Sequence, residues 1–170
     1  MPALTHRIEP LDKRHDRQDF SCGSVALDRY LQQQARQDAD KHVAAPFVLV
    51  EPPAATVLGY YTLSASILNV DDIAPELAKK LPRYPQLPVT LIGRLAIDTR
   101  LKGQGRGEFL LMDALHRSLA HAAEIAAMAV VVDAKDEAAA AFYRHFDFAP
   151  LQTNPRRLYL PMKTVAMLLG

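Results

Sequence analysis

The stretch RLKGQGRGEFLL, residues 100–111, places three glycines at alternate positions directly before a segment of good helix formers. Glycine inside an element costs about 0.5–1 kcal/mol relative to alanine, so a run of glycines indicates that something approaches this backbone closely. Successive backbone N–H groups at a helix N-terminus form an anion site. The stretch therefore predicts a loop that binds a phosphate or pyrophosphate. The competing interpretation is a tight strand-to-helix turn whose glycines need positive φ.

Two common nucleotide-binding motifs do not fit this loop. Walker A requires lysine after its last glycine, whereas Gly107 is followed by Glu108. The Rossmann fingerprint G-x-G-x-x-G also fails, because the spacing here is G-x-G-x-G. The loop is therefore neither of these two phosphate-binding loops.

Hydrophobic patterns around the loop predict a mixed α/β fold. Residues 89–98 have the pattern of a strand, the loop leads into a helix over 105–121, and residues 126–134 form a second buried strand. Two strands joined through a helix should be parallel, with a right-handed crossover. Further expected elements are a strand at 6–9, a helix over 25–39 with Ser24 as N-cap, strands at 46–51 and 57–70 (one or two), a loop over 71–88 with at most a short helix at 76–80, a helix over 136–146 and closing strands at 148–151 and 156–161.

Bulk composition limits the class of protein. The chain has 170 residues, about half of them apolar, which predicts a single domain over 1–170 with a buried core. The formal net charge of +1 is no global nucleic-acid signature, so a polyanion would have to meet a local patch. A single cysteine, Cys22, excludes an internal disulfide framework. The polar N-terminus and the lack of a long apolar run lead us to expect a cytoplasmic protein without membrane contact.

The glycine loop resembles the acetyl-CoA pyrophosphate loop of GNAT N-acetyltransferases, R/Q-x-x-G-x-G/A after a central strand. Residues 100–105 match this motif literally, and residues 102–107 match with lysine in the first position. We prefer the second register, because it places the last glycine at the start of the helix. The resemblance implies acetyl-CoA as co-substrate and the GNAT fold, a twisted mixed sheet of about six or seven strands with helices on both faces.

Four longer stretches narrow the resemblance to the acetyltransferase toxins of bacterial toxin–antitoxin modules. They are FSCGSVALDRYL (20–31), LGYYTLSA (58–65), GRLAIDTRLKGQGRG (93–107) and VDAKDEAAAAFYRHFDF (132–148), followed by the closing LYLPMKTVAMLL. This resemblance implies an enzyme that acetylates the α-amino group of an aminoacyl-tRNA and blocks translation. It also implies a homodimer and a ribbon-helix-helix antitoxin, with DNA bound only through the antitoxin complex.

Two residues depart from the family pattern. The helix over 136–146 is followed by Asp147, where the family usually has glycine in a left-handed conformation that aspartate tolerates less well. Asp136 stands where the family often has asparagine. A carboxylate caps a helix equally well but would repel CoA phosphates if it faced them.

Tyr143 is the catalytic residue that the resemblance implies, as the general acid for the leaving thiolate. A phenol pKa of about 10 keeps its proton available at neutral pH. Phe142 and Phe146 share a helix face, and Tyr143 is expected beside that stripe; the alternative is a core tyrosine. No base is assigned, because an α-amino group with a pKa of about 7.7–8.0 is already partly neutral. No metal is expected, because the histidines lack zinc-ligand spacing with cysteine.

The strand before the loop should offer its edge to the pantetheine amides of CoA. Leu95 and Ile97 share one face and Arg94 and Ala96 the other. For Arg94 two interpretations stay open, a position facing the acceptor cleft or a salt bridge, for instance with Asp98. The predicted cofactor-binding residues are Leu95, Ala96, Ile97, Lys102, Gly103, Gln104, Gly105, Arg106, Gly107, Asp136 and Phe142, and the predicted substrate or tRNA contacts are Arg94, Lys79, Lys80 and Arg83.

Two other functions compete with a tRNA-acetylating toxin. One is an acetyltransferase for a small amine, a protein N-terminus or a lysine, which the near-neutral charge leaves open. The other is a catalytically silent acyl-CoA-binding module. The variant Tyr143→Phe separates enzyme from binding module, since only an enzyme loses activity while keeping its acetyl-CoA affinity.

Overall fold

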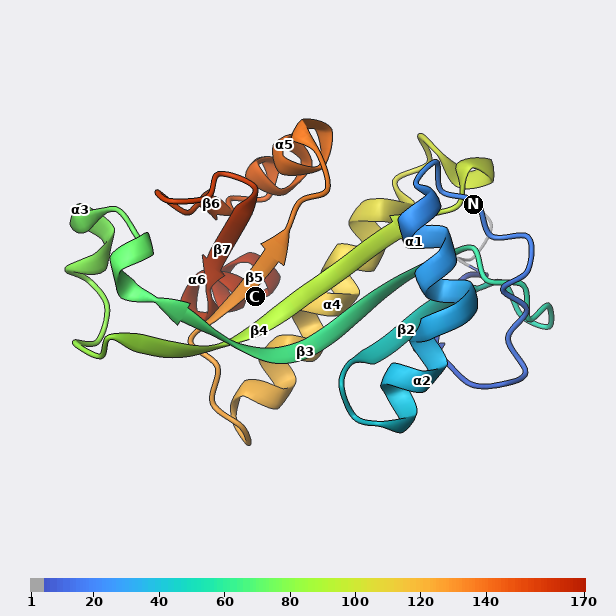
Figure 1. The fold of residues 1–170 in the computed structure, drawn as a ribbon, viewed down its shortest axis with the longest axis horizontal. Helices are drawn as coiled ribbons and strands as arrows, with labels where there is room; N and C mark the ends of the chain where they lie inside the picture. Colours follow the sequence, from blue (N-terminus) through green and yellow to red (C-terminus); the bar gives the residue numbers. More distant parts are fainter. Residues whose placement is uncertain (1–4) are drawn as a thin grey trace. The chain divides into compact units, whose positions relative to one another are not determined.

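The computed structural model describes residues 5–170 (Figure 1). The strands are β1 (Arg7–Pro10), β2 (Ala45–Val50), β3 (Gly59–Asn69), β4 (Gln86–Ile97), β5 (Ala129–Asp133), β6 (Ala149–Pro150) and β7 (Arg157–Pro161). The helices are α1 (Val25–Arg29), α2 (Ala35–Asp40), α3 (Pro75–Ala78), α4 (Arg106–Ala122), α5 (Glu137–His145) and α6 (Met162–Leu169), with a π-helical turn η1 (Tyr30–Gln34) and 3₁₀ turns η2 (Val70–Asp72) and η3 (Thr99–Leu101).

The strands form a mixed sheet of seven strands in the order β1-β2-β3-β4-β5-β7-β6. β1, β2 and β3 pair antiparallel, β4 and β5 pair parallel, and β7 pairs antiparallel with both β5 and β6. The predicted mixed α/β class and the parallel pair across the glycine loop are confirmed. Val130, Val131 and Val132 of β5 are all buried, so both faces of this strand are covered. A continuous apolar sequence is typical of such a strand.

The chain divides into two compact units. One contains the chain up to Ser64 together with Gly93–Ala114, and the other contains Ala65–Ile92 and Leu115–Gly170. Residues of β3, β4 and α4 therefore belong to both units. The single domain expected from chain length stays a prediction.

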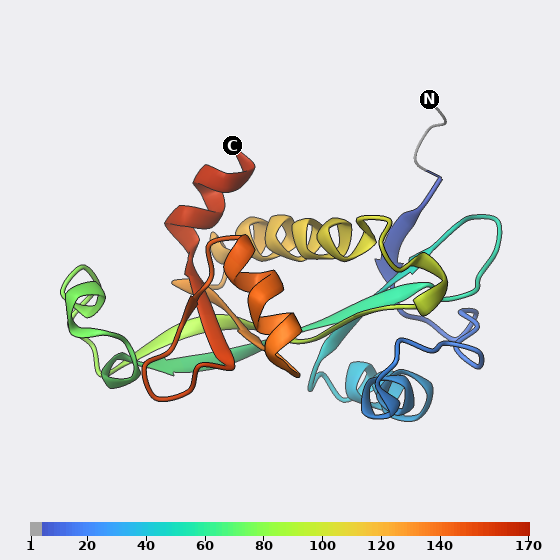
Figure 2. The ribbon, with the colours of Figure 1, turned by 90° about the horizontal axis from the view of Figure 1, so that it is seen from above.

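In the first unit, helices cover both faces of β3. Tyr60 belongs to a buried cluster with Tyr30 and Leu31 on the α1–α2 side. The next residue, Tyr61, donates a hydrogen bond of 2.6 Å from its hydroxyl to Asp113 of α4. Successive side chains of a strand point to opposite faces, so α1–α2 and α4 lie on opposite sides of this strand (Figure 2). The predicted arrangement of helices on both faces is confirmed for this unit.

Gly59 allows β3, β4 and α4 to pack closely. A Cβ at this position would lie 2.8 Å from Cδ1 of Ile97, 3.1 Å from the carbonyl oxygen of Ala96 and 3.1 Å from Cδ1 of Leu110. Two of these neighbours are branched side chains in a packed interior, where added volume forces the structure to shift.

The second unit is built on β5 and β7. Its buried cluster combines Val131 of β5 and Tyr159 of β7 with residues of the 65–92 segment, among them Leu68 and Val89. α6 follows β7 directly and is a helix that the sequence analysis did not predict. Its eight residues, MKTVAMLL, are mostly apolar but amphipathic at the helical period, so the signal was present in the sequence and was missed.

Two predictions need correction. The helix expected over 25–39 is interrupted by the π-helical turn η1, although Ser24 caps it by accepting a hydrogen bond of 3.3 Å from the Leu27 N–H. β4 begins at Gln86, so the predicted loop over 71–88 is too long. Its Pro88 has no N–H, but its carbonyl still accepts a hydrogen bond of 2.8 Å from Met128. Two expectations hold. The segment 57–70 contains one long strand, β3. Asp147 adopts the expected left-handed conformation, with φ of 71°.

Candidate active site

The C-terminal half of β4 extends beyond its pairing with β5. The β4–β5 register runs from Val89 to Ile92 and ends there, so no residue of β5 pairs with residues 93–97. Unpaired backbone N–H and C=O groups along a strand edge are a template for an extended ligand with amide groups. The predicted contacts Leu95, Ala96 and Ile97 all lie in this part of β4.

The side chains of this segment alternate as expected. Ala96 is buried in the same cluster as Tyr60, whereas Ile97 faces the position where Gly59 and Leu110 meet. Arg94 therefore lies on the α1–α2 face of β4. Its Cζ lies 3.5 Å from the centre of the Tyr30 ring.

Asp98, the first residue after β4, anchors the start of the glycine loop. Its buried carboxylate accepts hydrogen bonds from the N–H of Ser21 (3.1 Å), from the N–H of Arg100 (2.9 Å) and from Nε and Nη2 of Arg100 (2.9 and 3.0 Å). Thr99 N–H also donates to the Ser21 carbonyl at 2.9 Å. Burial raises the pKa of Asp98, but the hydrogen bonds from Arg100 and Ser21 and the charge of Arg100 outweigh it, so its pKa lies below the ordinary range.

Asp98 was not among the predicted site residues. The sequence offered one local signal for Asp98. An aspartate often begins a turn by accepting a hydrogen bond from the N–H two residues later, which here is that of Arg100. Its second partner, Ser21, lies 77 residues away and left no trace in the sequence. The suggested salt bridge between Arg94 and Asp98 is wrong, because Asp98 pairs with Arg100 instead.

The glycine loop has the backbone that both interpretations required. Gly103 and Gly105 have φ of 82° and 73°, a conformation that favours glycine. A Cβ at either position would meet no atom within 4 Å, so the space in front of the loop is open. Lys102 is exposed, whereas the guanidinium of Arg100 is held by Asp98. This difference favours the motif register that begins at Lys102.

Arg106, the first residue of α4, supplies an observation that fits a bound phosphate. Its Nε is buried and has no hydrogen-bond partner within residues 5–170. A buried donor without a partner costs about 1–3 kcal/mol, which an acceptor oxygen of a ligand would recover. The free N–H groups of the first turn of α4 and this nitrogen together suit a pyrophosphate.

Tyr143 lies in the second unit, on α5. The helix begins at Asp136, whose side chain accepts a hydrogen bond of 2.8 Å from the Ala139 N–H. The Tyr143 ring is 5% exposed and packs edge-on against Phe142 and Phe148, with ring centres 5.3 and 5.5 Å away. Tyr143, which the sequence placed beside the Phe142–Phe146 stripe, is itself buried.

The hydroxyl of Tyr143 has no hydrogen-bond acceptor in the part of the chain that the structure describes. The hydroxyl oxygen is not among the buried side-chain atoms that lack a partner, so water or a ligand group can accept its hydrogen bond. Burial and, to a smaller extent, the charge of Asp133 raise the pKa of Tyr143 well above its ordinary value. The phenol is therefore protonated at neutral pH and available as a proton donor.

The remaining predicted residues lie at the surface. Lys79, Lys80 and Arg83 are exposed in the segment between α3 and β4, and none of them forms an ion pair with a described residue. Tyr84 beside them is 67% exposed. Within residues 5–170, no helix is long and apolar enough to cross a membrane, and no group of three or more His, Cys, Asp or Glu side chains is placed to hold a metal.

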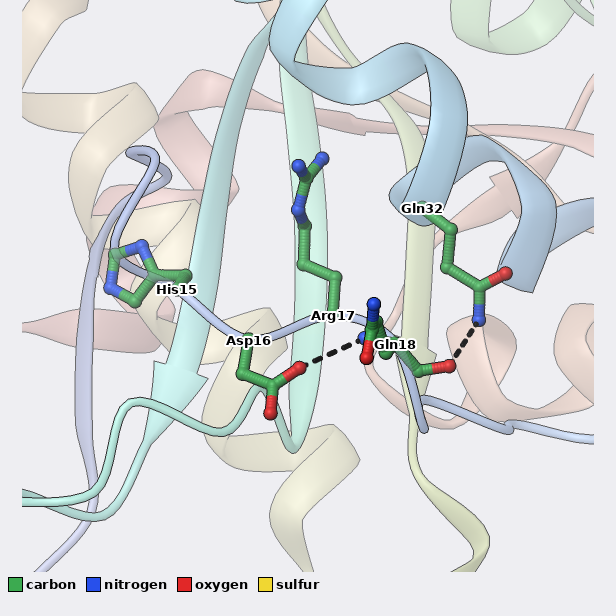
Figure 3. Close-up of a pocket in the computed structure, with 5 residues that line it drawn as sticks. All are labelled: His15, Asp16, Arg17, Gln18 and Gln32. Atoms are coloured by element: carbon green, nitrogen blue, oxygen red, sulfur yellow. Dashed lines mark hydrogen bonds between the residues drawn. The ribbon is translucent and has the colours of Figure 1, made fainter.

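A polar pocket of about 340 Å³ in the first unit contains none of the predicted site residues. It is lined by His15, Asp16, Arg17, Gln18 and Gln32 (Figure 3). Internal hydrogen bonds hold its wall, since Gln32 Nε2 donates to the Gln18 carbonyl at 3.2 Å and Gln18 N–H donates to Asp16 at 3.1 Å. No reaction chemistry is assigned to this pocket.

Comparison with known proteins decides the family. The model of the acetyltransferase (GNAT) family matches residues 19–148. The chain belongs to the GNAT family. This GNAT acetyltransferase is 30% identical to a probable toxin TacT of Sinorhizobium fredii and 34% identical to a tRNA-acetylating toxin of Mycobacterium tuberculosis. Both matches cover 99% of this chain and 97% of the relative.

Solved structures resemble this GNAT acetyltransferase over nearly its whole length. AtaT complexed with acetyl-methionyl-tRNAfMet has a TM-score of 0.89 at 31% identity, covering 97% of this chain and 99% of the other. A tyrosine-to-phenylalanine mutant of AtaT bound to acetyl-CoA and the C-terminus of the antitoxin AtaR has a TM-score of 0.83 at 28% identity over 98% and 99%. The AtaT–AtaR complex bound to DNA has a TM-score of 0.79 at 29% identity over 96% and 99%.

Proposed function

We propose that this chain transfers the acetyl group of acetyl-CoA to the α-amino group of an aminoacyl-tRNA and thereby blocks translation. The observation that carries the proposal is the unpaired edge of β4 leading into an anchored glycine loop. This geometry belongs to a chain whose relatives, matched over almost their full length, include a tRNA-acetylating toxin. The solved complex of AtaT with an acetylated aminoacyl-tRNA supports the same substrate class.

Acetyl-CoA supplies the acetyl group as a thioester. Residues 95–97 bind its pantetheine amides through the strand edge, and the loop from Lys102 to Gly107, with Gln104 and Arg106, binds the pyrophosphate. The orphaned Nε of Arg106 supports this assignment. Asp136 caps α5 through one carboxylate oxygen, and its predicted place beside the cofactor stays part of this proposal.

Tyr143 is the general acid, and Phe142 packs against its ring. The neutral amine attacks the thioester carbonyl carbon, the carbon–sulfur bond breaks, and the phenol gives its proton to the departing thiolate. The proton lost by the amine passes to solvent, and the phenolate takes one back. No protein base is needed, because an α-amino group with a pKa of about 7.7–8.0 is partly neutral at physiological pH.

Contacts with the tRNA backbone belong to basic side chains that no acid among residues 5–170 neutralises. Lys79, Lys80 and Arg83 meet this description, and the exposed ring of Tyr84 beside them can stack on a base. A local patch of this kind is required because the net charge of the chain is only +1.

The proposal includes an antitoxin and a homodimer. The antitoxin is a ribbon-helix-helix protein, and DNA is bound only through its complex with the toxin. The structures of AtaT with AtaR, and of that complex with DNA, support a partner of this kind.

A translation reaction with purified protein and labelled acetyl-CoA tests the function. The expected result is label on aminoacyl-tRNA together with halted protein synthesis. Binding of acetyl-CoA with unlabelled RNA and normal translation would overturn it. Label on small amines, protein N-termini or lysines would then identify the alternative acetyltransferase, and no label at all would identify a silent acyl-CoA-binding module.

A further inference from the structure

Arg94 has a guanidinium group without an acceptor. Its Cζ lies 3.5 Å from the centre of the Tyr30 ring, and it makes no hydrogen bond or ion pair within residues 5–170. Arginine carries five N–H donors in a planar fork that matches the two oxygens of a phosphate or carboxylate. This half-buried cation lies beside aromatic rings. The charge of Arg94 helps to lower the pKa of Asp38, but the two side chains form no ion pair, so the N–H donors of Arg94 stay available for an anionic ligand.

The ring beneath Arg94 is held in place. The Tyr30 hydroxyl donates to Asp38 Oδ2 at 2.7 Å, and Gln34 Nε2 donates to the other oxygen at 3.0 Å. Tyr30 also stacks with Tyr60 at 6.3 Å and an interplanar angle of 15°. Asp38 is thus occupied, so it stabilises the ring that supports Arg94 rather than pairing with the guanidinium.

Tyr30 owes its position to an unusual backbone. It begins the π-helical turn η1, which interrupts the helix from Val25 to Asp40. Single π-helical turns inside α-helices occur frequently at functional sites. The π-helical turn and the hydrogen bonds among Tyr30, Gln34 and Asp38 therefore fix the position of the ring on which Arg94 lies.

The position of Arg94 along β4 indicates which ligand it meets. In the proposed function, the pantetheine arm runs from the glycine loop back along residues 97–95. Residues 93–97, five strand residues, span about 16 Å, so an extended arm that starts at the glycine loop places its thioester toward the Arg94 end of this segment. Arg94 is on the α1–α2 face, opposite α4, where the acceptor amine can approach without displacing the cofactor.

We propose that Arg94, held on the Tyr30 ring, binds the last phosphodiester of the aminoacyl-tRNA, which joins the aminoacylated nucleotide to its neighbour. This inference rests on the proposed function and names the group that the site recognises. Among the groups of the aminoacylated terminal nucleotide, this phosphate is the one that carries a negative charge. Arg94 is thereby a substrate-binding residue, and Tyr30 is its positioning residue.

The test compares two aminoacyl-tRNAs that differ only at this linkage, one with the natural phosphodiester and one with a neutral methylphosphonate. For the natural enzyme the KM should rise about tenfold to a hundredfold with the neutral linkage, as expected for a charge-assisted hydrogen bond. For Arg94→Gln the two substrates should have the same, high KM. The acetyl-CoA Kd should not change, which also shows that the variant is folded.

Further variants separate the contributions of the Arg94 charge, of its planar guanidinium group and of the Tyr30 ring. Arg94→Lys keeps the charge but not the fork, and should discriminate less than the natural enzyme. Tyr30→Phe keeps the ring but loses the hydrogen bond to Asp38, so it should retain more discrimination than Tyr30→Leu. Tyr30→Leu should lose discrimination through KM rather than kcat. Arg36→Gln, which changes another half-buried arginine of the same face, is the matched control and should discriminate fully.

Equal KM values for the two substrates with the natural enzyme would overturn the inference. Undiminished discrimination by Arg94→Gln and Arg94→Lys would also overturn it. Failure of the natural enzyme to acetylate either tRNA would instead overturn the proposed function, and this inference with it.

Discussion

The Arg100 guanidinium donates two hydrogen bonds to Asp98, at 2.9 and 3.0 Å, at the point where β4 becomes the glycine loop. The same carboxylate accepts from the Ser21 N–H. One buried side chain therefore joins the end of the strand, the loop and the N-terminal segment. The conformation of the glycine loop depends on this carboxylate as well as on the glycines.

Asp98→Asn should therefore lower both stability and cofactor affinity. The amide retains the shape but cannot accept from all four donors, which should reduce the free energy of unfolding by about 1–3 kcal/mol. Urea denaturation and calorimetric titration with acetyl-CoA measure the two effects. Asp40→Asn, at the exposed end of α2, is the control and should change stability by less than about 0.5 kcal/mol. An unchanged acetyl-CoA Kd in Asp98→Asn would contradict the assigned role.

The depressed pKa of Asp98 predicts a pH dependence of stability. Because its pKa is lower in the folded than in the unfolded chain, its contribution is complete above the unfolded value of 3.8 and is lost as the pH falls through the folded value. The difference in unfolding free energy between the natural protein and Asp98→Asn should therefore shrink below about pH 4. Urea titrations from about pH 6 to pH 3 measure this difference. A constant difference across that range would show that the charge of Asp98 does not contribute.

Tyr143→Phe should lower kcat by about 10²–10⁴-fold, the usual contribution of a general acid, and leave the acetyl-CoA Kd unchanged. Since burial raises the pKa of Tyr143, the basic limb of the kcat profile that reports this group should lie above about pH 10. Steady-state kinetics across the pH range measures both. Tyr159→Phe, at another buried tyrosine of the second unit, should keep the natural kcat. Full activity of Tyr143→Phe would remove Tyr143 from the mechanism.

Gly59→Ala should destabilise the protein by about 1–3 kcal/mol, because the added Cβ would overlap Cδ1 of Ile97 at 2.8 Å. Gly93→Ala is the matched comparison. Its Cβ would meet only the Thr62 hydroxyl, at 3.2 Å, so the loss should be smaller. Thermal or urea unfolding of the two variants gives the order. A larger loss in Gly93→Ala would contradict the packing described for β3, β4 and α4.

Removing the charges of Lys79, Lys80 and Arg83 should weaken tRNA binding without changing acetyl-CoA affinity. Each lost phosphate contact should reduce the salt dependence of tRNA binding by a slope of about 0.7–0.9. Binding measured at several salt concentrations, with Lys→Gln and Arg→Gln changes made singly and together, tests this. Lys163→Gln, an exposed change on α6, is the control. An unchanged slope would leave these three side chains as ordinary surface charges.

Much of the fold follows from local patterns in the sequence. The strand–loop–helix–strand segment, the parallel pair of β4 and β5, and the helix caps at Ser24 and Asp136 are all as expected. These features depend on residues close in the chain, through alternation, helical periodicity and short side chains that accept from nearby N–H groups. Local signals were missed in α6, whose eight residues are amphipathic at the helical period. At Pro88 the proline was assigned to a loop, although it lies inside β4.

The sequence by itself determined the family, the glycine loop and Tyr143 as the acid to test. Only the tertiary structure decided that Asp98 holds the loop through Ser21, and that Arg94 lies on Tyr30 rather than pairing with Asp98. The physical reason is that partners far apart in the chain meet only when strands and helices pack in one register. Which acid a given arginine meets is set by that packing, and local preferences carry no record of it.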